Sequence, residues 1–294
     1  MTAHDQTDVT DSAPADLPEV VGVLGGGRMG AGIAHAFLVR GPRVVVVEND
    51  EAAAEAARAR VVTSVGRAAE RGLLTSTVDE ALGRLNVTTA ADDLAGAGLV
   101  VEAVPEDTDL KLEVLRRAER VAPGAVLATN TSSLSVSGIA AGLKAPERFI
   151  GLHFFNPVPA SDLVEVVVGE QTGDDLVEQA RGWVTALGKT AITVQDSPGF
   201  ASSRLGVAIA LEAMRMVQEG VASAQDIDTA MTLGYRHPVG PLRTTDIVGL
   251  DVRLAIAEHL TRELGPRFEP PQVLRDKVAA GELGRKTGRG FYDW

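Results

Sequence analysis

The chain has 294 residues, 45% of them hydrophobic, and a mean hydropathy of +0.09, which is typical of a globular protein long enough for two domains. Its formal net charge of −12 argues against general nucleic-acid binding, because phosphate contacts need clustered Lys and Arg side chains. The absence of cysteine excludes disulfides, thiolate metal sites and a cysteine nucleophile and fits a cytoplasmic location, and no apolar run approaches the roughly 20 residues that a membrane-spanning helix needs.

The first eighteen residues are predicted to form a disordered acidic tail. They carry four Asp residues, lack Lys and Arg, and contain no apolar segment. A secretory signal needs a basic start and an apolar core, and a transit peptide is rich in Arg, so residues 1–18 fit neither. We therefore expect the first folded domain to begin at residue 19.

A glycine-rich turn follows the first predicted strand. The β-branched run at 19–24 leads directly into Gly25, Gly27 and Gly30, and residues 31–38 then have helical spacing. The three glycines fill the pattern G-x-G-x-x-G, in which they make a tight turn, let the backbone approach a pyrophosphate, and let the helix pack on the strand. We interpret this segment as a dinucleotide-binding loop, with a purely structural glycine turn as the alternative.

An acidic residue closes the next predicted strand, at 43–47. Glu48 lies about twenty residues beyond the loop, where a carboxylate can accept hydrogen bonds from both ribose hydroxyls of an adenosine. Residues 49–51 are Asn, Asp and Glu, with no Arg to hold a 2′-phosphate. The sequence therefore predicts NAD, and not NADP, as the cofactor.

Three arginines share one face of the predicted helix at 51–71. Arg60, Arg67 and Arg71 are spaced i, i+7 and i+11. A solvated helix surface accounts for this spacing, and so does a binding surface for the phosphates of a substrate with a nucleotide tail. The sequence leaves both interpretations open.

Strands and helices then alternate up to residue 196. Helices are predicted at 105–121 and 174–187, and strands at 85–88, 99–104, 125–128, 149–152, 163–168 and 190–194. Such alternation after a glycine turn is typical of an α/β domain with a doubly wound, mostly parallel Rossmann sheet. We therefore assign residues 19–196 to a cofactor-binding Rossmann domain.

A polar cluster at 129–134 follows one of these strands. Ligands of open α/β sheets bind at the carboxyl ends of the strands, and Ser132 is our candidate there. A helix N-cap for the segment that follows is an equally good local explanation.

A histidine and a glutamate stand in apolar, strand-like surroundings within residues 151–168. Burying a carboxylate among valines costs several kcal/mol unless it is paired, and imidazole is the partner that titrates near neutral pH. His153 and Glu165 are therefore candidates for a buried acid–base pair. The alternative is a core histidine and a glutamate on the solvent face of an edge strand.

The pattern changes at Ser197-Pro-Gly199, after which no comparably strong strand signal follows. Alanine- and leucine-rich segments predict an all-helical second domain at 197–294, with helices at 205–219, 224–233, 252–264 and 271–280. The basic and aromatic tail at 284–294 is expected to pack on this domain.

Taken together, these motifs resemble the L-3-hydroxyacyl-CoA dehydrogenase family, particularly its bacterial 3-hydroxybutyryl-CoA members, from about residue 19 to the C-terminus. The resemblance rests on order and spacing more than on any one motif. It is carried by the Gly25–Gly30 loop, Val101-Glu-Ala-Val-Pro-Glu106, Asn130-Thr-Ser-Ser133, His153-Phe-Phe-Asn-Pro157, Glu165, Ser197-Pro-Gly-Phe200 and Gly284-Arg-Lys-Thr-Gly288.

The resemblance implies oxidation of the 3-hydroxyl of an acyl-CoA, with hydride passing to NAD. It assigns His153 as the general base and Glu165 as the residue that orients the imidazole and stabilises its charged form. Ser132 would hydrogen-bond the reacting oxygen, Asn156 would support the constellation, and Glu102 would lie on the nicotinamide side of the cleft. Family members usually form dimers through the helical domain, so a homodimer is implied.

One position departs from the family pattern. Many relatives have an asparagine immediately before Arg-Leu, and its amide contacts the substrate oxygen from the second domain, whereas Ser203 stands here. A hydroxyl is shorter and donates one proton where an amide donates two. Either a water or Ser202 completes the site, or the acyl group of the substrate differs.

Two other functions remain possible on the sequence alone. One is a dehydrogenase of the same fold that acts on a hydroxy acid or sugar acid without CoA. The other is a catalytically inactive NAD-binding scaffold, since the fold also serves structural roles. The combination of Ser132, His153 and Glu165 favours the acyl-CoA dehydrogenase.

Overall fold

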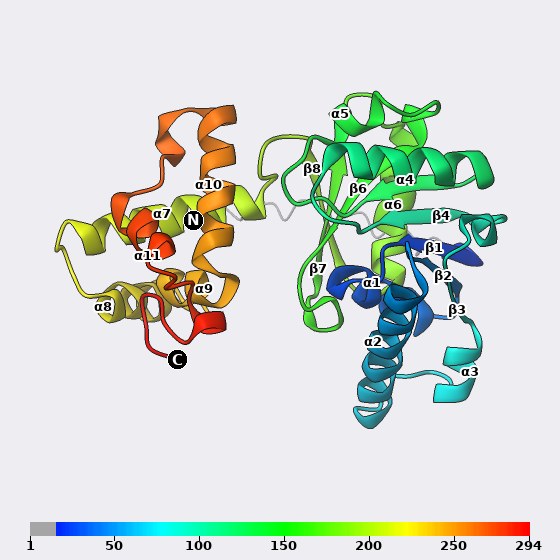
Figure 1. The fold of residues 1–294 in the computed structure, drawn as a ribbon, viewed down its shortest axis with the longest axis horizontal. Coiled ribbons are helices and arrows are strands. Elements are labelled where there is room, and N and C mark those ends of the chain that lie inside the picture. Colours follow the sequence, from blue (N-terminus) through cyan, green and yellow to red (C-terminus); the bar gives the residue numbers. More distant parts are fainter. Residues whose placement is uncertain (1–15) are drawn as a thin grey trace, which may run out of the picture. The chain divides into compact units, whose positions relative to one another are not determined.

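The computed structural model describes residues 16–294. The disordered tail predicted for residues 1–18 therefore lies mostly outside the described residues. At its end the prediction was wrong, because Leu17 is partly buried against the core of the first unit. Contacts divide the chain into two units that meet between Asp196 and Ser197, and each is described by itself (Figure 1).

The first unit is built on one eight-stranded sheet of order β3-β2-β1-β4-β5-β6-β7-β8. The order of its first six strands is that of a dinucleotide-binding sheet. Every strand pair is parallel except β6 and β7, which run antiparallel. The mostly parallel Rossmann sheet is thus confirmed, with strands β1 (Val20–Leu24), β2 (Arg43–Val47), β3 (Leu85–Thr88), β4 (Leu99–Glu102), β5 (Val126–Thr129), β6 (Phe149–Phe154), β7 (Leu163–Val168) and β8 (Thr190–Gln195).

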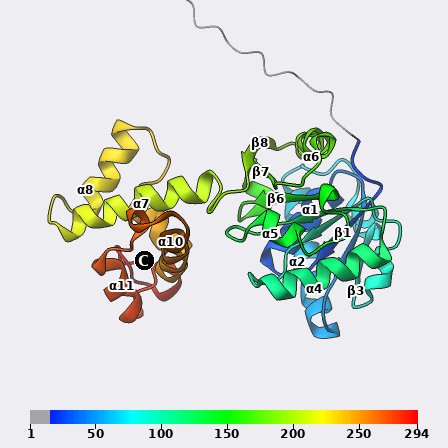
Figure 2. The same ribbon diagram turned by 90° about the horizontal axis from the view of Figure 1, so that it is seen from above.

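Helices pack on both faces of this sheet (Figures 1 and 2). They are α1 (Arg28–Leu38), α2 (Glu51–Glu70), α3 (Val78–Gly83), α4 (Thr108–Val121), α5 (Val136–Ala140) and α6 (Asp174–Ala186). The predicted start of α4 at residue 105 was wrong, because the Asp107 side chain caps the helix by accepting from the Leu110 backbone. The short α3 was missed, although Thr77 and Glu80 form the capping box that begins it.

A single apolar cluster joins the sheet to four of these helices. Buried valines of β1 and β2 belong to it together with apolar side chains of α1, α2, α3 and α6, among them Phe37, Val61, Ala81 and Trp183. Strands buried on both faces read as continuous apolar runs, which is why residues 43–47 show no alternation. The packed sheet fixes the carboxyl ends of β1, β4, β5 and β6, where the candidate site lies.

The second unit is helical, as predicted. It contains α7 (Ser202–Gln218), α8 (Ala224–Thr229), a π-helical turn η4 (Ala230–Gly234), α9 (Pro241–Val248), α10 (Leu250–Leu264) and α11 (Gln272–Ala279). The sequence missed α9, which begins with Pro241 and is separated from α10 only by Gly249. Its core includes Leu211, Met214, Leu242 and Leu260.

The C-terminal tail packs on this second unit, as expected. The carboxylate of the buried Asp246 accepts hydrogen bonds from the backbones of Phe291 and Tyr292 and from the indole of Trp294, all at 2.9 Å. Across residues 16–294, no helix is both long and apolar enough to cross a membrane.

Candidate active site

The glycine loop between β1 and α1 has the shape that a pyrophosphate needs. Gly25 has φ +86°, a left-handed conformation that favours glycine. A Cβ on Gly30 would lie 1.8 Å from the Gly25 carbonyl oxygen, so only glycine lets α1 start this close to the turn. A Cβ on Gly27 would meet nothing within 4 Å, because this backbone faces open space at the start of α1. An eleven-residue helix begins here, and the N-terminus of such a helix offers its backbone amides to an anion.

A cavity of about 700 Å³ opens beside this loop. It is lined by Gly25 and Gly27, by Glu48 and Asn49 after β2, and by residues 103–105 after β4, among others. Glu48 Oε1 accepts a hydrogen bond of 2.6 Å from the Gly26 backbone, so its carboxylate is held at the mouth of the loop. The loop, the cavity and the carboxylate together fit an adenosine dinucleotide.

His153 and Glu165 form the buried pair that the sequence suggested. They lie directly opposite each other on the antiparallel strands β6 and β7, so their side chains leave the same face of the sheet. His153 Nδ1 lies 2.7 Å from Glu165 Oε2, and Glu165 is fully buried while His153 is 7% exposed. The alternative of a solvent-facing glutamate is therefore wrong. A carboxylate that accepts the Nδ1 proton leaves the lone pair on Nε2, which makes the imidazole a base.

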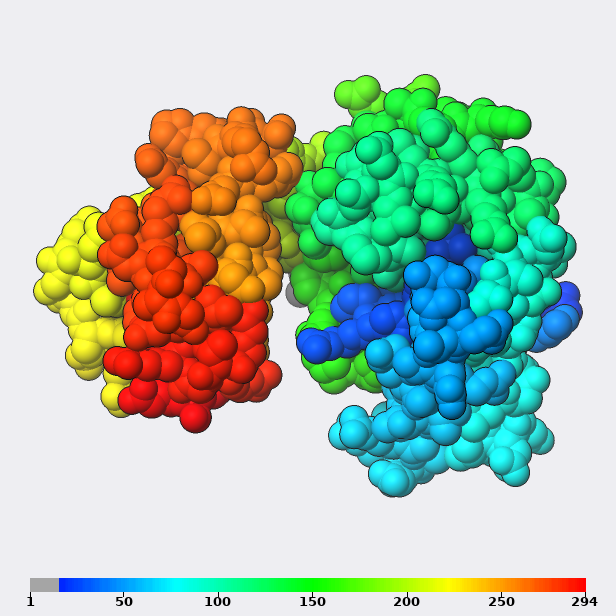
Figure 3. Space-filling view, in the orientation of Figure 1, coloured from blue at the N-terminus to red at the C-terminus, as the bar shows by residue number. Residues whose placement is uncertain are grey.

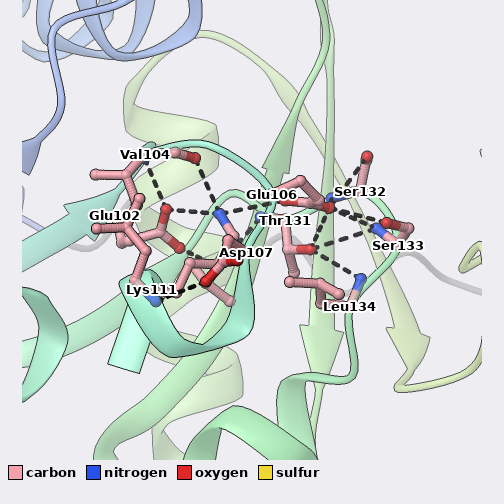
Figure 4. A network of polar contacts seen from close by, with 11 residues as sticks. Glu102, Val104, Glu106, Asp107, Lys111, Thr131, Ser132, Ser133 and Leu134 are labelled. Atoms are coloured by element: carbon pink, nitrogen blue, oxygen red, sulfur yellow. Dashed lines mark hydrogen bonds and ion pairs between the residues drawn. The ribbon is translucent and has the colours of Figure 1, made fainter. Parts of the chain in front are cut away.

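Ser132 lies in the loop after β5, but it does not cap the helix that follows. The N-cap of α5 is Ser135, whose side chain accepts from the Gly138 backbone. The structure instead directs residues 131–133 at Glu106 (Figure 4). Oε1 of Glu106 accepts from the backbones of Ser132 and Ser133 at 3.0 and 3.1 Å and from the Thr131 hydroxyl at 2.6 Å.

Glu106 was not among the predicted site residues, although it ends the motif Val101-Glu-Ala-Val-Pro-Glu106. Burial pushes the pKa of its carboxyl upward, but the Lys111 ammonium and the donors from residues 131–133 together hold that pKa below its ordinary value. Glu106 therefore stays ionised and keeps accepting hydrogen bonds from the Ser132 loop near neutral pH. No spacing in the sequence reveals this contact, because 25 residues separate Glu106 from Thr131.

Glu102, expected beside the nicotinamide, has no exposed surface. Its carboxylate accepts from Lys111 Nζ and the Thr129 hydroxyl, both at 2.6 Å, and from the Val104 backbone at 2.7 Å. Burial is the main reason that the pKa of Glu102 is raised above its ordinary value. Within the protein Glu102 anchors Lys111, and its place on the nicotinamide side of the cleft stays a prediction.

A second cavity, of about 430 Å³, lies between α1, α2 and the loop after β6. Arg60 and Arg67 line it together with Arg28 and Asn156, whereas Arg71 is not among its lining residues. Helix α2, in blue in Figure 3, lies at the surface of its unit. The cavity thus brings two of the three predicted arginines to Asn156, which follows His153 by three residues.

Two family models match the chain, and together they cover almost all of it. The model of the 3-hydroxyacyl-CoA dehydrogenase NAD-binding domain matches residues 20–197, and that of the C-terminal domain matches residues 199–294. The chain belongs to the 3-hydroxyacyl-CoA dehydrogenase family. The cofactor of this dehydrogenase is NAD, which the loop and Glu48 fit, and the chain is an oxidoreductase.

Relatives of this dehydrogenase match over nearly their full length. A 3-hydroxybutyryl-CoA dehydrogenase of Mycobacterium tuberculosis is 43% identical over 285 residues, covering 95% of this chain and 100% of the relative. The crystal structure of (S)-3-hydroxybutyryl-CoA dehydrogenase PaaH1 from Ralstonia eutropha superposes with a TM-score of 0.90 at 41% identity and covers 95% of this chain and 99% of that one. The mitochondrial hydroxyacyl-coenzyme A dehydrogenase of Sus scrofa is 36% identical over 96% of this chain and 93% of its own.

Two further residues of the dehydrogenase hold its site in place, and neither role could be predicted from the sequence. Asn130 Oδ1 accepts from the Phe154 backbone at 2.8 Å, next to His153. Lys189 Nζ donates to the carbonyls of Val158 and Ser161 at 2.7 and 2.5 Å. These two hydrogen bonds hold the loop between β6 and β7 in place.

Ser203 lies in the first turn of α7, in the second unit. The turn before it contains Gly199 at φ +75° and Phe200 at φ +48°, and the Phe200 backbone donates to the Ser197 carbonyl at 2.8 Å. This turn sets where α7 begins, and with it the position of Ser203. Contact of Ser203 with substrate stays a prediction.

Proposed function

We propose that this dehydrogenase oxidises short-chain L-3-hydroxyacyl-CoA substrates, such as 3-hydroxybutyryl-CoA, to the 3-ketoacyl-CoA. The observation that carries the proposal is the His153–Glu165 pair at 2.7 Å, in the same unit as the NAD loop. Relatives named 3-hydroxybutyryl-CoA dehydrogenase support the short acyl chain. The cysteine-free sequence fits our further proposal that the reaction takes place in the cytoplasm.

His153 acts as the general base in this proposal. Its Nε2 takes the proton of the 3-hydroxyl, while Nδ1–H stays hydrogen-bonded to Glu165. Glu165 holds the ring in this tautomer and stabilises the imidazolium as its positive charge develops. When bound, NAD supplies the acceptor for the hydride from C3, and the glycine loop and Glu48 would hold its pyrophosphate and ribose.

Three polar side chains complete the proposed site. The Ser132 hydroxyl donates to the reacting oxygen of the substrate, and the Asn156 amide supports the substrate beside the β6 end. Ser203, in the proposed substrate domain at 197–294, contributes a hydroxyl where many relatives have an amide. Because that hydroxyl reaches less far, we expect it to tolerate more variation in the acyl group than an amide would.

The CoA portion is proposed to bind along the cavity of Arg60 and Arg67. Guanidinium groups pair with phosphate through parallel hydrogen bonds, and both side chains are exposed at a cavity that also contains Asn156. In the described structure Arg60 also donates to the Gly26 carbonyl at 3.3 Å, so this residue touches the cofactor loop as well. Arg67 is therefore the cleaner probe of CoA binding.

We also propose a homodimer through the helical unit. This unit exposes large apolar side chains that a monomer would leave in water, among them Leu205 and Ile209 one turn apart on α7 and Val252 on α10. Packing two copies along such a surface would remove it from water.

A substrate panel tests the proposed function. NADH absorbance is followed with 3-hydroxybutyryl-CoA, longer and dicarboxylyl 3-hydroxyacyl-CoA, and free 3-hydroxy acids. We expect the short thioester to have the highest kcat/KM, and faster oxidation of free or sugar acids would favour the alternative without CoA. His153→Ala should lower turnover at least about a hundredfold while NAD still binds. Near-normal turnover of this variant would refute the mechanism.

Arg67→Ala tests the CoA cavity separately. Arg67 would contact the CoA phosphate equally in the bound substrate and in the transition state. Losing this contact should therefore raise KM for the thioester several-fold and leave kcat unchanged. Arg58→Ala is the matched control, because Arg58 is exposed on the same helix and does not line the cavity. An equal effect of both changes, or none of the Arg67 change, would contradict the proposed subsite.

A further inference from the structure

Lys111 is buried between two carboxylates of unlike exposure. Its Nζ lies 2.6 Å from Glu102 Oε1 and 3.2 Å from Glu106 Oε2. The Lys111 side chain is 1% exposed, and the Glu102 and Glu106 side chains are 0% and 36% exposed. One carboxylate is enough to neutralise a buried ammonium, so the second contact calls for its own explanation.

The two oxygens of Glu106 have different partners (Figure 4). Oε2 faces Lys111, and Oε1 faces the loop after β5, where it accepts from Thr131, Ser132 and Ser133. A glutamate side chain rotates readily when only one oxygen is bound. With Oε2 fixed by Lys111, Oε1 stays directed at the backbone of Ser132.

Glu102 connects the same loop to the sheet. It ends β4 in register with Thr129 of β5, and its Oε2 accepts from the Thr129 hydroxyl at 2.6 Å. The same hydroxyl oxygen accepts from the Thr131 backbone at 3.2 Å. The loop that carries Ser132 is therefore held from the sheet through Glu102 and from α4 through Lys111 and Glu106.

We propose that Glu102 and Lys111 are positioning residues for Ser132, acting through the Glu106 carboxylate. The inference rests on the proposed function, since it assumes that the Ser132 hydroxyl meets the reacting oxygen.

The first test is Glu102→Gln, which keeps the shape of the side chain and removes its charge. Residues that orient a catalytic group typically contribute about 10- to 100-fold, so we expect kcat to fall within that range and KM for the thioester to change little. The matched control is Glu119→Gln. Glu119 lies on α4, the helix that carries Lys111, and it holds a loop through the backbones of Lys144 and Ala145, but this loop carries no candidate site residue.

A neutral double variant separates positioning from stability. Glu102→Gln alone leaves the buried ammonium with the more exposed and more distant Glu106, at 3.2 Å, as its carboxylate partner and is expected to lower the melting temperature. Glu102→Gln with Lys111→Met removes both charges, so the melting temperature should recover while kcat stays low. Recovery of kcat together with stability would overturn the proposal in favour of a purely structural pair.

A double-mutant cycle with Ser132→Ala decides whether Glu102 acts through Ser132. Their side chains share no contact, so independent effects would multiply. We expect Glu102→Gln to cost less than about twofold once Ser132 is alanine. Multiplying losses would overturn the positioning role and leave the proposed function standing. A Ser132→Ala enzyme with wild-type kcat would instead refute the proposed role of Ser132, and this inference with it.

Discussion

Replacing Glu165 with glutamine tests the energetics of the buried pair most directly. The change preserves volume on β7 and still offers an oxygen to His153 Nδ1, but it removes the negative charge that faces the imidazolium during reaction. The charges lie about 4 Å apart when Nδ1 and Oε2 are 2.7 Å apart, and at an effective dielectric constant of about 20 their attraction is about 4 kcal/mol. That attraction exists only after proton transfer, so it corresponds to about a thousandfold in kcat.

The assay is initial-rate NADH formation with saturating 3-hydroxybutyryl-CoA, alongside NAD binding measured on the same protein. Glu170→Gln is the matched control, because Glu170 follows β7 by two residues and its side chain is exposed. Glu165→Gln should bind NAD normally and lose about three orders of magnitude in kcat, and the control should lose nothing. A loss below about tenfold would refute the argument that Glu165 stabilises a charge on His153.

Three further changes probe other parts of the chain. Glu48→Ala should raise KM for NAD about tenfold in steady-state kinetics without lowering kcat, because a charge-assisted hydrogen bond to the ribose is lost. Burial, with the charge of Lys189, lowers the pKa of His35 to about 4, below the 6.5 of the unfolded chain. The unfolded chain therefore takes up the proton first, so the free energy of unfolding falls by about 3 kcal/mol as pH drops from 7 to 4. His35→Leu should remove this part of the pH dependence, which denaturant titrations at both pH values would measure. Leu205→Glu should shift the molar mass measured by light scattering from dimer to monomer, and an unchanged mass would exclude α7 from the interface.

The sequence predicted the Rossmann sheet well because its signals are local. Strands of a parallel sheet are buried on both faces, so β2 appears as an uninterrupted valine run, and the glycine loop must follow β1 directly. The helices that were not predicted are short segments whose local signals are weak. Helix α9 has eight residues and adjoins α10, so hydrophobic periodicity cannot separate the two, and the capping box of α3 begins a helix of only six residues.

The site was less predictable because its contacts join distant residues. His153 and Glu165 were recognised as unusual from their apolar surroundings, but Glu106 was not, since a glutamate after Pro105 looks like an ordinary helix start. Only the fold brings Glu106 within 3.0 Å of the Ser132 backbone. The role of Lys189 was equally unpredictable, because nothing in the sequence indicates that the amine of the residue before β8 holds the connection between β6 and β7.

That connection determines whether the His153–Glu165 pair exists at all. Side chains alternate between the two faces of a strand, so a slip of one residue between β6 and β7 would move Glu165 to the opposite face from His153. An antiparallel strand pair takes its register from the loop that joins the two strands, here residues 155–162. Lys189 donates hydrogen bonds to two carbonyls of this loop. The single antiparallel step in an otherwise parallel sheet is thus what puts an acid and a base opposite each other, and a side chain outside the pair keeps them there.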